Sequence, residues 1–307
     1  MSDRGRFAAI LKTFIDRESS MNPQQLVQDI EHLFSLPDVA IRINELIDRP
    51  DTTTKELVEA VQLDAGIATT VLRLANSAWY GLPSRVDTIS RAITLIGMKA
   101  LQDLVLSTSV ITTFKGISSE FVDMMDFWDN SVTCGVVTRN LAKKCGVRES
   151  ERMFLAGLLH KVGRLVFYAS RPLQYRQVLQ EKDSGEAAII EAERAVFGFT
   201  YAELGAALMR AWRLPEALDE LIAYQLHAAD APGYPRETAI LHVAGDIAFH
   251  MSPDIKGRFQ LGEYNLTFDE AVWNSLGLER GELTEIMQTS LIQYFELLVI
   301  VNRRAYA

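Results

Sequence analysis

Apolar residues recur every three or four positions along most of the chain, a spacing that places them on one face of a helix. The clearest early stripes are Phe7, Ile10, Leu11, Phe14 and Ile15, followed by the apolar positions of 26–34, 39–47 and 57–61. Segments in which apolar and polar residues alternate, as in a half-buried strand, are almost absent. The pattern therefore predicts an all-α, multi-helix fold.

Residues that start or stop helices divide this pattern into elements. Asn22-Pro23, Thr54, Asp64 and Thr88 are placed to begin helices, and Thr200-x-x-Glu203 has the spacing of a capping box. In the second half, helices are predicted at about 122–145, 149–170, 172–182, 186–197, from Thr200 to Leu214-Pro215, and at 283–301, with two or three helices in all after Pro235. A break near residues 115–119 is expected to separate two helical lobes.

The last predicted helix carries a wide apolar face. Its seam consists of Leu283, Met287, Ser290, Tyr294, Leu297 and Val301, widened by Ile286, Leu291 and Leu298. Steps of four and three residues are typical both of a helix that packs on a globular body and of a coiled coil. We expect the face to dock onto the chain's own body, and a helix-mediated homodimer is the alternative.

Composition narrows the functional classes. The 307 residues carry 31 Lys and Arg against 40 Asp and Glu, a net charge of −9, which argues against general binding of nucleic acid or anionic membranes. The longest charge-free runs, eleven residues each, are too short to span a bilayer. The two cysteines, Cys134 and Cys145, cannot meet along one helix. With no signal-peptide pattern at the start, a cytoplasmic protein is expected.

Six short motifs, in this order along the chain, resemble those of the HDOD domain family. They are Leu72-x-Leu74-Ala75-Asn76-Ser77-Ala78-x-Tyr80-Gly81, Ile89-x-x-Ala92-Ile93-x-Leu95-Ile96-Gly97, Phe127-Trp128-x-x-Ser131, Gly157-Leu158-Leu159-His160-x-x-Gly163, Glu203-Leu204-Gly205-Ala206 and Trp212-x-Leu214-Pro215. The resemblance covers about two thirds of the chain. It implies a two-lobed, all-α signalling domain in which an N-terminal helical bundle precedes a bundle related to HD-type phosphohydrolases, and a family generally regarded as non-enzymatic.

This resemblance suggests a division of the chain. We expect an N-terminal helix at 1–21, the N-terminal lobe at 22–117, the pseudo-HD lobe at 118–228, and a C-terminal helical extension at 229–307 that packs on the second lobe.

The resemblance also identifies the positions at which an active HD enzyme would hold metal. These positions are occupied by Asn130, His160, Lys161, Tyr201, Gln225-Leu226 and, with a one-residue shift, Asp246. Lys161 replaces the signature aspartate, so a cation stands where a carboxylate ligand is needed. Only His160 and Asp246 remain as candidate ligands, and catalytic metal sites use at least three protein ligands. We therefore expect no catalytic residue, no metal and no cofactor.

Each remaining polar residue has a structural alternative. Lys161 could bind an anion or nucleotide in the degenerate cleft, but we favour a lysine whose stem packs while its ammonium reaches water. For His160 we favour a buried, hydrogen-bonded imidazole over a metal ligand. His242, Asp246 and His250 share a helix face at steps of four, which spans about 12 Å and is too long for one tetrahedral ion.

Two aromatic residues could contact a partner. Trp79 and Tyr80 precede the turn at Gly81, where exposed aromatics would form a binding anchor. The alternative, which we favour, is that they fill the junction between the two lobes.

Together these observations predict a non-catalytic regulatory protein that presents a surface to another signalling protein, with gating by a small ligand in the degenerate cleft as one mode of control. A metal-dependent phosphohydrolase with substituted ligands and a nucleotide-sensing module are the alternatives. A monomer or a weak homodimer is expected.

Overall fold

The computed structural model describes residues 22–30, 34–77, 79–82, 84–114, 117, 122–251 and 270–305. Every regular element in these ranges is helical, which confirms the all-α class. The elements are α2 (Pro23–Ile30), α3 (Asp38–Ile47), α4 (Thr54–Gln62), α5 (Ala65–Ala75), α6 (Ile89–Ile96), α7 (Met98–Thr113), α8 (Met124–Lys144), α9 (Ser150–Leu159), α10 (Val162–Ser170), α11 (Pro172–Val178), the 3-10 helix η1 (Leu179–Ser184), α12 (Glu186–Phe197), α13 (Tyr201–Ala211), α14 (Glu216–Tyr224), the 3-10 helix η2 (Ala228–Asp230), α15 (Pro235–Met251), α16 (Glu270–Ser275) and α17 (Arg280–Ala305).

The predicted helix starts are close to the observed ones. Asp64 and Thr88 accept the backbone N–H three residues later and cap α5 and α6. The capping box at Thr200 is present, whereas Thr53 rather than Thr54 caps α4. Because these bonds form within four residues of sequence, local spacing is enough to predict them.

The predicted helix at 149–170 is wrong in one respect. The chain breaks at His160 and Lys161, which separate α9 from α10. Gly163 explains the break, because a Cβ built there would lie 2.0 Å from the Tyr201 carbonyl oxygen. The backbone at the start of α10 therefore packs directly against the backbone of α13. The chain changes direction after α9 to make this contact.

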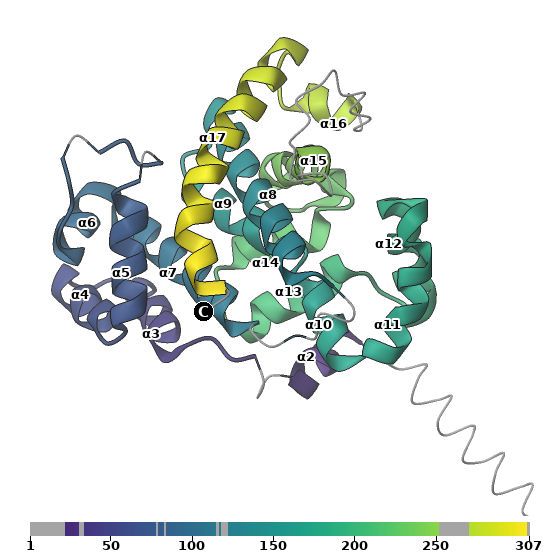
Figure 1. Cartoon of the computed structure of the whole chain (residues 1–307), viewed down its shortest axis with the longest axis horizontal. Coiled ribbons are helices and arrows are strands. Elements are labelled where there is room, and N and C mark those ends of the chain that lie inside the picture. The colour runs from purple at the N-terminus through teal and green to yellow at the C-terminus, as the bar shows by residue number, and fades with distance from the viewer. Residues whose placement is uncertain are drawn as a thin grey trace, which may run out of the picture.

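Two groups of helices form the molecule (Figure 1). Helices α3 to α7 pack on one another as the first lobe, and α8 to α10 and α13 to α15 form the larger second lobe, in which α8 and α9 share the most extensive contact. Gly97, at φ 89°, allows the sharp turn between α6 and α7. The predicted lobe break at 115–119 lies, apart from residue 117, outside the described residues.

One helix differs from the predicted division of the chain. Helix α2, which the boundary at residue 22 assigns to the first lobe, packs instead on α10 and α13 of the second. Leu26, Val27 and Ile30 form its buried face. Arg171 of the second lobe adds an ion pair, 2.7 Å from Asp29. The other boundaries stay predictions.

The C-terminal helices cover the second lobe. Helix α15 packs on α8, and α17 lies across α8 while also touching α5 and α7 (Figure 1). Ile286, Met287, Ser290, Tyr294 and Leu297 of the predicted seam are buried. This part of the apolar face is thus covered by the chain's own body, as expected, whereas the side chains of Leu298 and Val301 lie outside the described ones.

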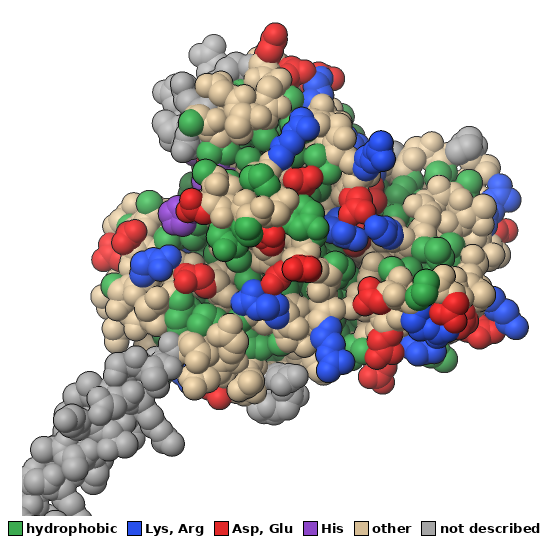
Figure 2. Space-filling view, turned by 180° about the vertical axis from the view of Figure 1, so that it is seen from behind, with side chains coloured by type: hydrophobic (Ala, Val, Ile, Leu, Met, Phe, Trp, Pro, Cys, Tyr) green, Lys and Arg blue, Asp and Glu red, His purple; other side chains and the backbone are tan. Residues whose placement is uncertain are grey.

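No single helix in the described part of the chain has both the length and the apolar composition to cross a membrane. Helices α6 and α7 satisfy that test only as a pair, and they are bent by 117° relative to each other. On the face turned away from α17, acidic and basic side chains are interspersed (Figure 2).

Candidate functional site

The chain turn between α9 and α10 carries the two residues that the sequence singled out most strongly. His160 is the last residue of α9's terminal turn, and Lys161 precedes the first residue of α10. Around them lie Gln225 at the end of α14 and two residues of α15, His242 and Asp246. We call these five residues the His160 cluster.

His160 is a buried, hydrogen-bonded imidazole, as favoured from the sequence. It is 2% exposed, and Nδ1 lies 2.7 Å from the Gly157 carbonyl oxygen. Because a carbonyl only accepts, Nδ1 carries the proton and Nε2 carries the lone pair. Nε2 is buried with no hydrogen-bond partner among the described groups. Burial, reinforced by the charge of Lys161, lowers the pKa of His160 to about 3, so the ring is neutral.

Lys161 differs from the interpretation we favoured. Its side chain is 13% exposed, and the ammonium lies 3.4 Å from Oε1 of Glu186 on α12. The Phe249 ring lies 5.9 Å from the same nitrogen. The ammonium is therefore paired inside the protein, and its stem does not simply extend it into water.

Glu186 joins Lys161 to a buried cation, Arg164 of α10. Arg164 donates to Glu186 at 3.1 Å and to Glu193 at 3.0 Å. Burial alone would raise the pKa of Glu186, but Arg164 and Lys161 outweigh it and hold the pKa at about 2. The carboxylate is thus ionised, which suits two cations in contact with it.

Tyr201 belongs to this ion network and not to a ligand set. The Arg164 guanidinium carbon lies 4.4 Å from the centre of its ring, and its backbone N–H donates to Glu193 at 2.8 Å. Glu193 is fully buried. Our sequence analysis missed this network, although charged Arg164 within the apolar run Val162–Phe167 was a usable signal.

Gln225 fills its position with hydrogen bonds to the backbone. Its Nε2 donates to the His160 carbonyl at 2.8 Å and to the Ile222 carbonyl at 2.9 Å. The backbone carbonyl oxygen of Gln225 in turn accepts a hydrogen bond from His242 Nδ1 at 2.8 Å. Because Gln225 Nε2 donates to one carbonyl at the end of α9 and to another near the end of α14, it fixes these two helix ends relative to each other.

Asp246 is the one carboxylate among the ligand positions that the family resemblance identified. Its Oδ2 lies 4.0 Å from His242 Nε2. Burial raises its pKa, while His242, His250 and Lys161 act in the opposite direction. Asn130 is half-buried on α8, the helix that also carries Cys134. Burial raises the pKa of Cys134 to about 12, so that thiol is protonated.

These residues do not fit the metal centre of an HD phosphohydrolase. His160 Nε2 could serve as one ligand, but the described residues bring no three His, Cys, Asp or Glu side chains together in a way that could hold a metal ion. The Lys161 ammonium, paired with Glu186, adds positive charge to the same place.

Trp79 and Tyr80 form a contact between elements far apart in sequence. Trp79 Nε1 and the Tyr80 hydroxyl each donate to the same oxygen of Glu151, at 3.1 Å. Arg139 lies 3.8 Å from the Trp79 ring and donates to Glu151 at 2.8 Å. Trp79 is 5% exposed, so its ring fills the space between the lobes.

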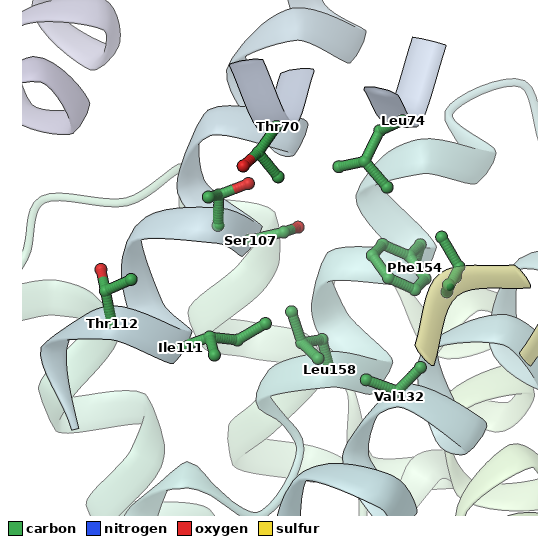
Figure 3. A pocket seen from close by; sticks show the side chains of 10 residues that line it. Thr70, Leu74, Ser107, Ile111, Thr112, Val132, Phe154 and Leu158 are labelled. Atoms are coloured by element: carbon green, nitrogen blue, oxygen red, sulfur yellow. The ribbon is translucent and has the colours of Figure 1, made fainter. Parts of the chain in front are cut away.

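An apolar cavity of about 30 Å³ lies where α5, α7, α8, α9 and α17 meet (Figure 3). Leu74, Ile111, Phe154 and Leu158 face it. The hydroxyl groups at its edge are occupied, since Thr70 donates to Gly66 and Ser107 donates to Asp103. This space is enough for about one or two water molecules, and its walls are mainly apolar, so we interpret the cavity as a packing gap between lobes.

Comparison with known proteins identifies the same family that the sequence motifs resemble. The family model of the HDOD domain matches residues 33–228. An uncharacterized protein of Treponema pallidum is 25% identical over 222 residues, which are 71% of this chain and 42% of that protein. The present chain therefore spans about two fifths of the length of that curated relative.

Solved structures share the fold. A protein of Shewanella amazonensis SB2B, provisionally named a phosphohydrolase, matches with a TM-score of 0.71 and 26% identity over 90% of this chain and 97% of that one. An HDOD domain protein of unknown function from Geobacter sulfurreducens gives 0.64 at 21% identity, over 87% and 96%. A protein of Marinobacter aquaeolei VT8, provisionally named a signal transduction protein, gives 0.69 at 21% identity, over 99% and 67%.

Proposed function

Because the chain belongs to the HDOD domain family, we propose that it is a non-catalytic regulatory protein of a bacterial signalling system, acting by contact with another protein.

The ion pair between Lys161 and Glu186 is the main observation that supports this proposal. A metal-dependent phosphohydrolase needs carboxylates and imidazoles that neutralise the positive charge of the metal. At the matched position this chain supplies an ammonium 3.4 Å from Glu186. The ammonium takes up carboxylate charge that a metal would require, and it repels a second cation in the same place.

Elemental analysis beside a phosphodiesterase assay tests the non-catalytic assignment. After dialysis against a chelator and reloading with manganese, iron or nickel, we expect no stoichiometric metal and no turnover of phosphodiesters. Lys161→Asp should bind at most one metal weakly and still show no turnover, because Tyr201 and Gln225 supply no ligand. Lys55→Asp, at an exposed position of α4, makes the same charge change and serves as the control.

A phosphohydrolase with substituted ligands is the second candidate. It is favoured by the Shewanella amazonensis structure at 26% identity and by the unpartnered lone pair of His160 Nε2. Tight stoichiometric metal in the wild type, with turnover abolished by His160→Ala, would establish this second candidate and overturn the first.

The regulatory half of the proposal has its own test. Affinity-tagged protein, cross-linked in its native host, should retain another protein at a fixed stoichiometry. Recovery of the tagged chain alone under the same conditions would contradict the proposal.

A further inference from the structure

A groove lies at the opposite end of α9 from His160. It has a volume of about 550 Å³, and it is formed by the start of α7, the residues that lead into α9, one side of α14 and the start of α15. Helix α9 has ten residues, so its two ends are about 15 Å apart at 1.5 Å per residue. The groove is therefore distinct from the His160 cluster.

Basic side chains outnumber acidic ones in this groove. It is lined by the four cations Lys99, Arg148, Arg152 and Arg236 and by the two acids Glu149 and Glu237. Four positive charges against two negative ones leave an excess of two. The whole chain carries a net charge of −9, so a local positive excess is the reverse of what its composition favours.

The contacts within the groove leave part of this charge available. Glu149 is shared by two cations, with Lys99 at 2.9 Å and Arg152 at 2.6 Å. The hydrogen bond from Lys99 lowers the pKa of Glu149, so this acid is ionised and neutralises only one charge. Arg148 and Arg236 are exposed to solvent. Their guanidinium groups can make paired hydrogen bonds to phosphate oxygens.

The remaining lining suits an aromatic ring. Tyr234, 38% exposed, stands on one side of the groove. Val147, Met153 and Leu221 supply apolar surface beside it. Small-molecule sites usually have volumes of about 300–1,000 Å³ and combine apolar walls with a few placed charges. The groove has this size and this combination.

We propose that this groove binds a nucleotide, with its phosphate groups at Arg148 and Arg236 and its base beside Tyr234. Lys99 belongs to α7 of the first lobe, and the other cations belong to the second. The groove therefore lies where the two lobes meet, so a nucleotide bound in it is placed to influence their association. The site is independent of the function proposed above, since it uses none of the residues of the His160 cluster.

Isothermal titration calorimetry of the full chain at low ionic strength tests the proposal, with ADP, adenosine and inorganic phosphate as probes. We expect saturable binding of ADP, weaker binding of adenosine and of phosphate, and loss of ADP affinity as salt is added. Arg148→Glu should weaken ADP binding about tenfold or more, the effect of losing one charge-assisted contact. Arg236→Glu should act in the same direction.

Arg42→Glu is the matched control, because it makes the same charge change at an exposed position of α3. Its ADP affinity should equal that of the wild type, and equal unfolding midpoints establish that all variants are folded. Equal weakening by Arg42→Glu and Arg148→Glu would overturn the site. Binding of adenosine or phosphate as tight as that of ADP would overturn the nucleotide assignment, and absence of saturable ADP binding would overturn the proposal altogether.

Discussion

Asp103 is a carboxyl group placed inside the protein. It lies on α7 with 4% of its surface exposed, and one of its oxygens has no hydrogen-bond partner among the described groups. Burial raises its pKa from 3.8 to about 7, against the opposing effect of Arg152. His160 has the opposite character, since burial lowers its pKa from 6.5 to about 3. Removal from water thus favours the neutral form of both groups, and Asp103 keeps its proton up to about pH 7.

The raised pKa of Asp103 predicts a pH dependence of stability. Between pH 4 and pH 7 the folded chain keeps a proton that the unfolded chain has lost, so the contribution of Asp103 to stability falls as pH rises through this range. The change is about 1.4 kcal/mol per pH unit, up to roughly 4 kcal/mol in total. Asp103→Asn removes the ionisation and should gain stability relative to the wild type as pH rises from 4 to 7.

Urea unfolding of both proteins at a series of pH values measures this difference. Asp87→Asn, at an exposed position, is the control for loss of a carboxyl group. Stability curves of wild type and Asp103→Asn that stay parallel from pH 4 to 8 would contradict the assignment.

At the scale of elements, Gly163 sets the distance between α10 and α13, and Gly205 lies opposite it. A Cβ at Gly163 would lie 2.0 Å from the Tyr201 carbonyl oxygen and 2.7 Å from the Gly205 nitrogen. Both of these atoms belong to the backbone, so the helices themselves would have to separate. A Cβ at Gly205 would have its one tight contact with the Ile222 side chain, at 3.0 Å, which can adjust, while the Gly163 nitrogen, at 3.5 Å, is at an ordinary contact distance.

Gly163→Ala should therefore destabilise the fold by about 3 kcal/mol or more, at the upper end of the cost of overpacking. Gly205→Ala should cost about 1 kcal/mol or less, because the higher helix propensity of alanine offsets part of the contact. Thermal or urea unfolding of the two variants compares them directly. Equal effects would mean that α10 and α13 can move apart at little cost.

At the scale of the whole molecule, α17 connects the two lobes. It lies on α8 and also reaches α5 and α7. Asn140 of α8 donates to Ser290 at 2.9 Å and to Gln293 at 3.0 Å, which fixes α17 along α8. Tyr294 and Leu297 of the seam are buried against the chain's own body, so these two side chains do not face a second copy.

Light scattering should therefore show a monomer for the full chain. A chain truncated before Gly281 loses the cover of α8, and we expect it to self-associate and to unfold at a lower temperature than the full chain. A full-length dimer that becomes monomeric on truncation would instead support the helix-mediated dimer.

The contacts between the two lobes could not be predicted from the spacing of apolar residues along the chain. Trp212 donates from Nε1 to the Phe34 carbonyl at 3.0 Å across 178 positions of sequence. The sequence identified Trp212 as part of a motif, but the position of its partner depends on how helices pack. The placement of α2 on the second lobe has the same origin, because burial of Leu26 and Ile30 depends on the nearest apolar surface and not on order along the chain.

By itself, the sequence determined the helical class, most helix starts and the family, because periodicity, capping and motifs are properties of neighbouring residues. Through the family resemblance it also predicted Lys161 and Gln225 as altered ligand positions and His160 as a retained one. Only the tertiary structure decided that Lys161 pairs with Glu186 and that the chain breaks before α10. The groove of Lys99, Arg148, Arg152 and Arg236 likewise brings together cations from three regions of sequence, and only folding places their charges in one space.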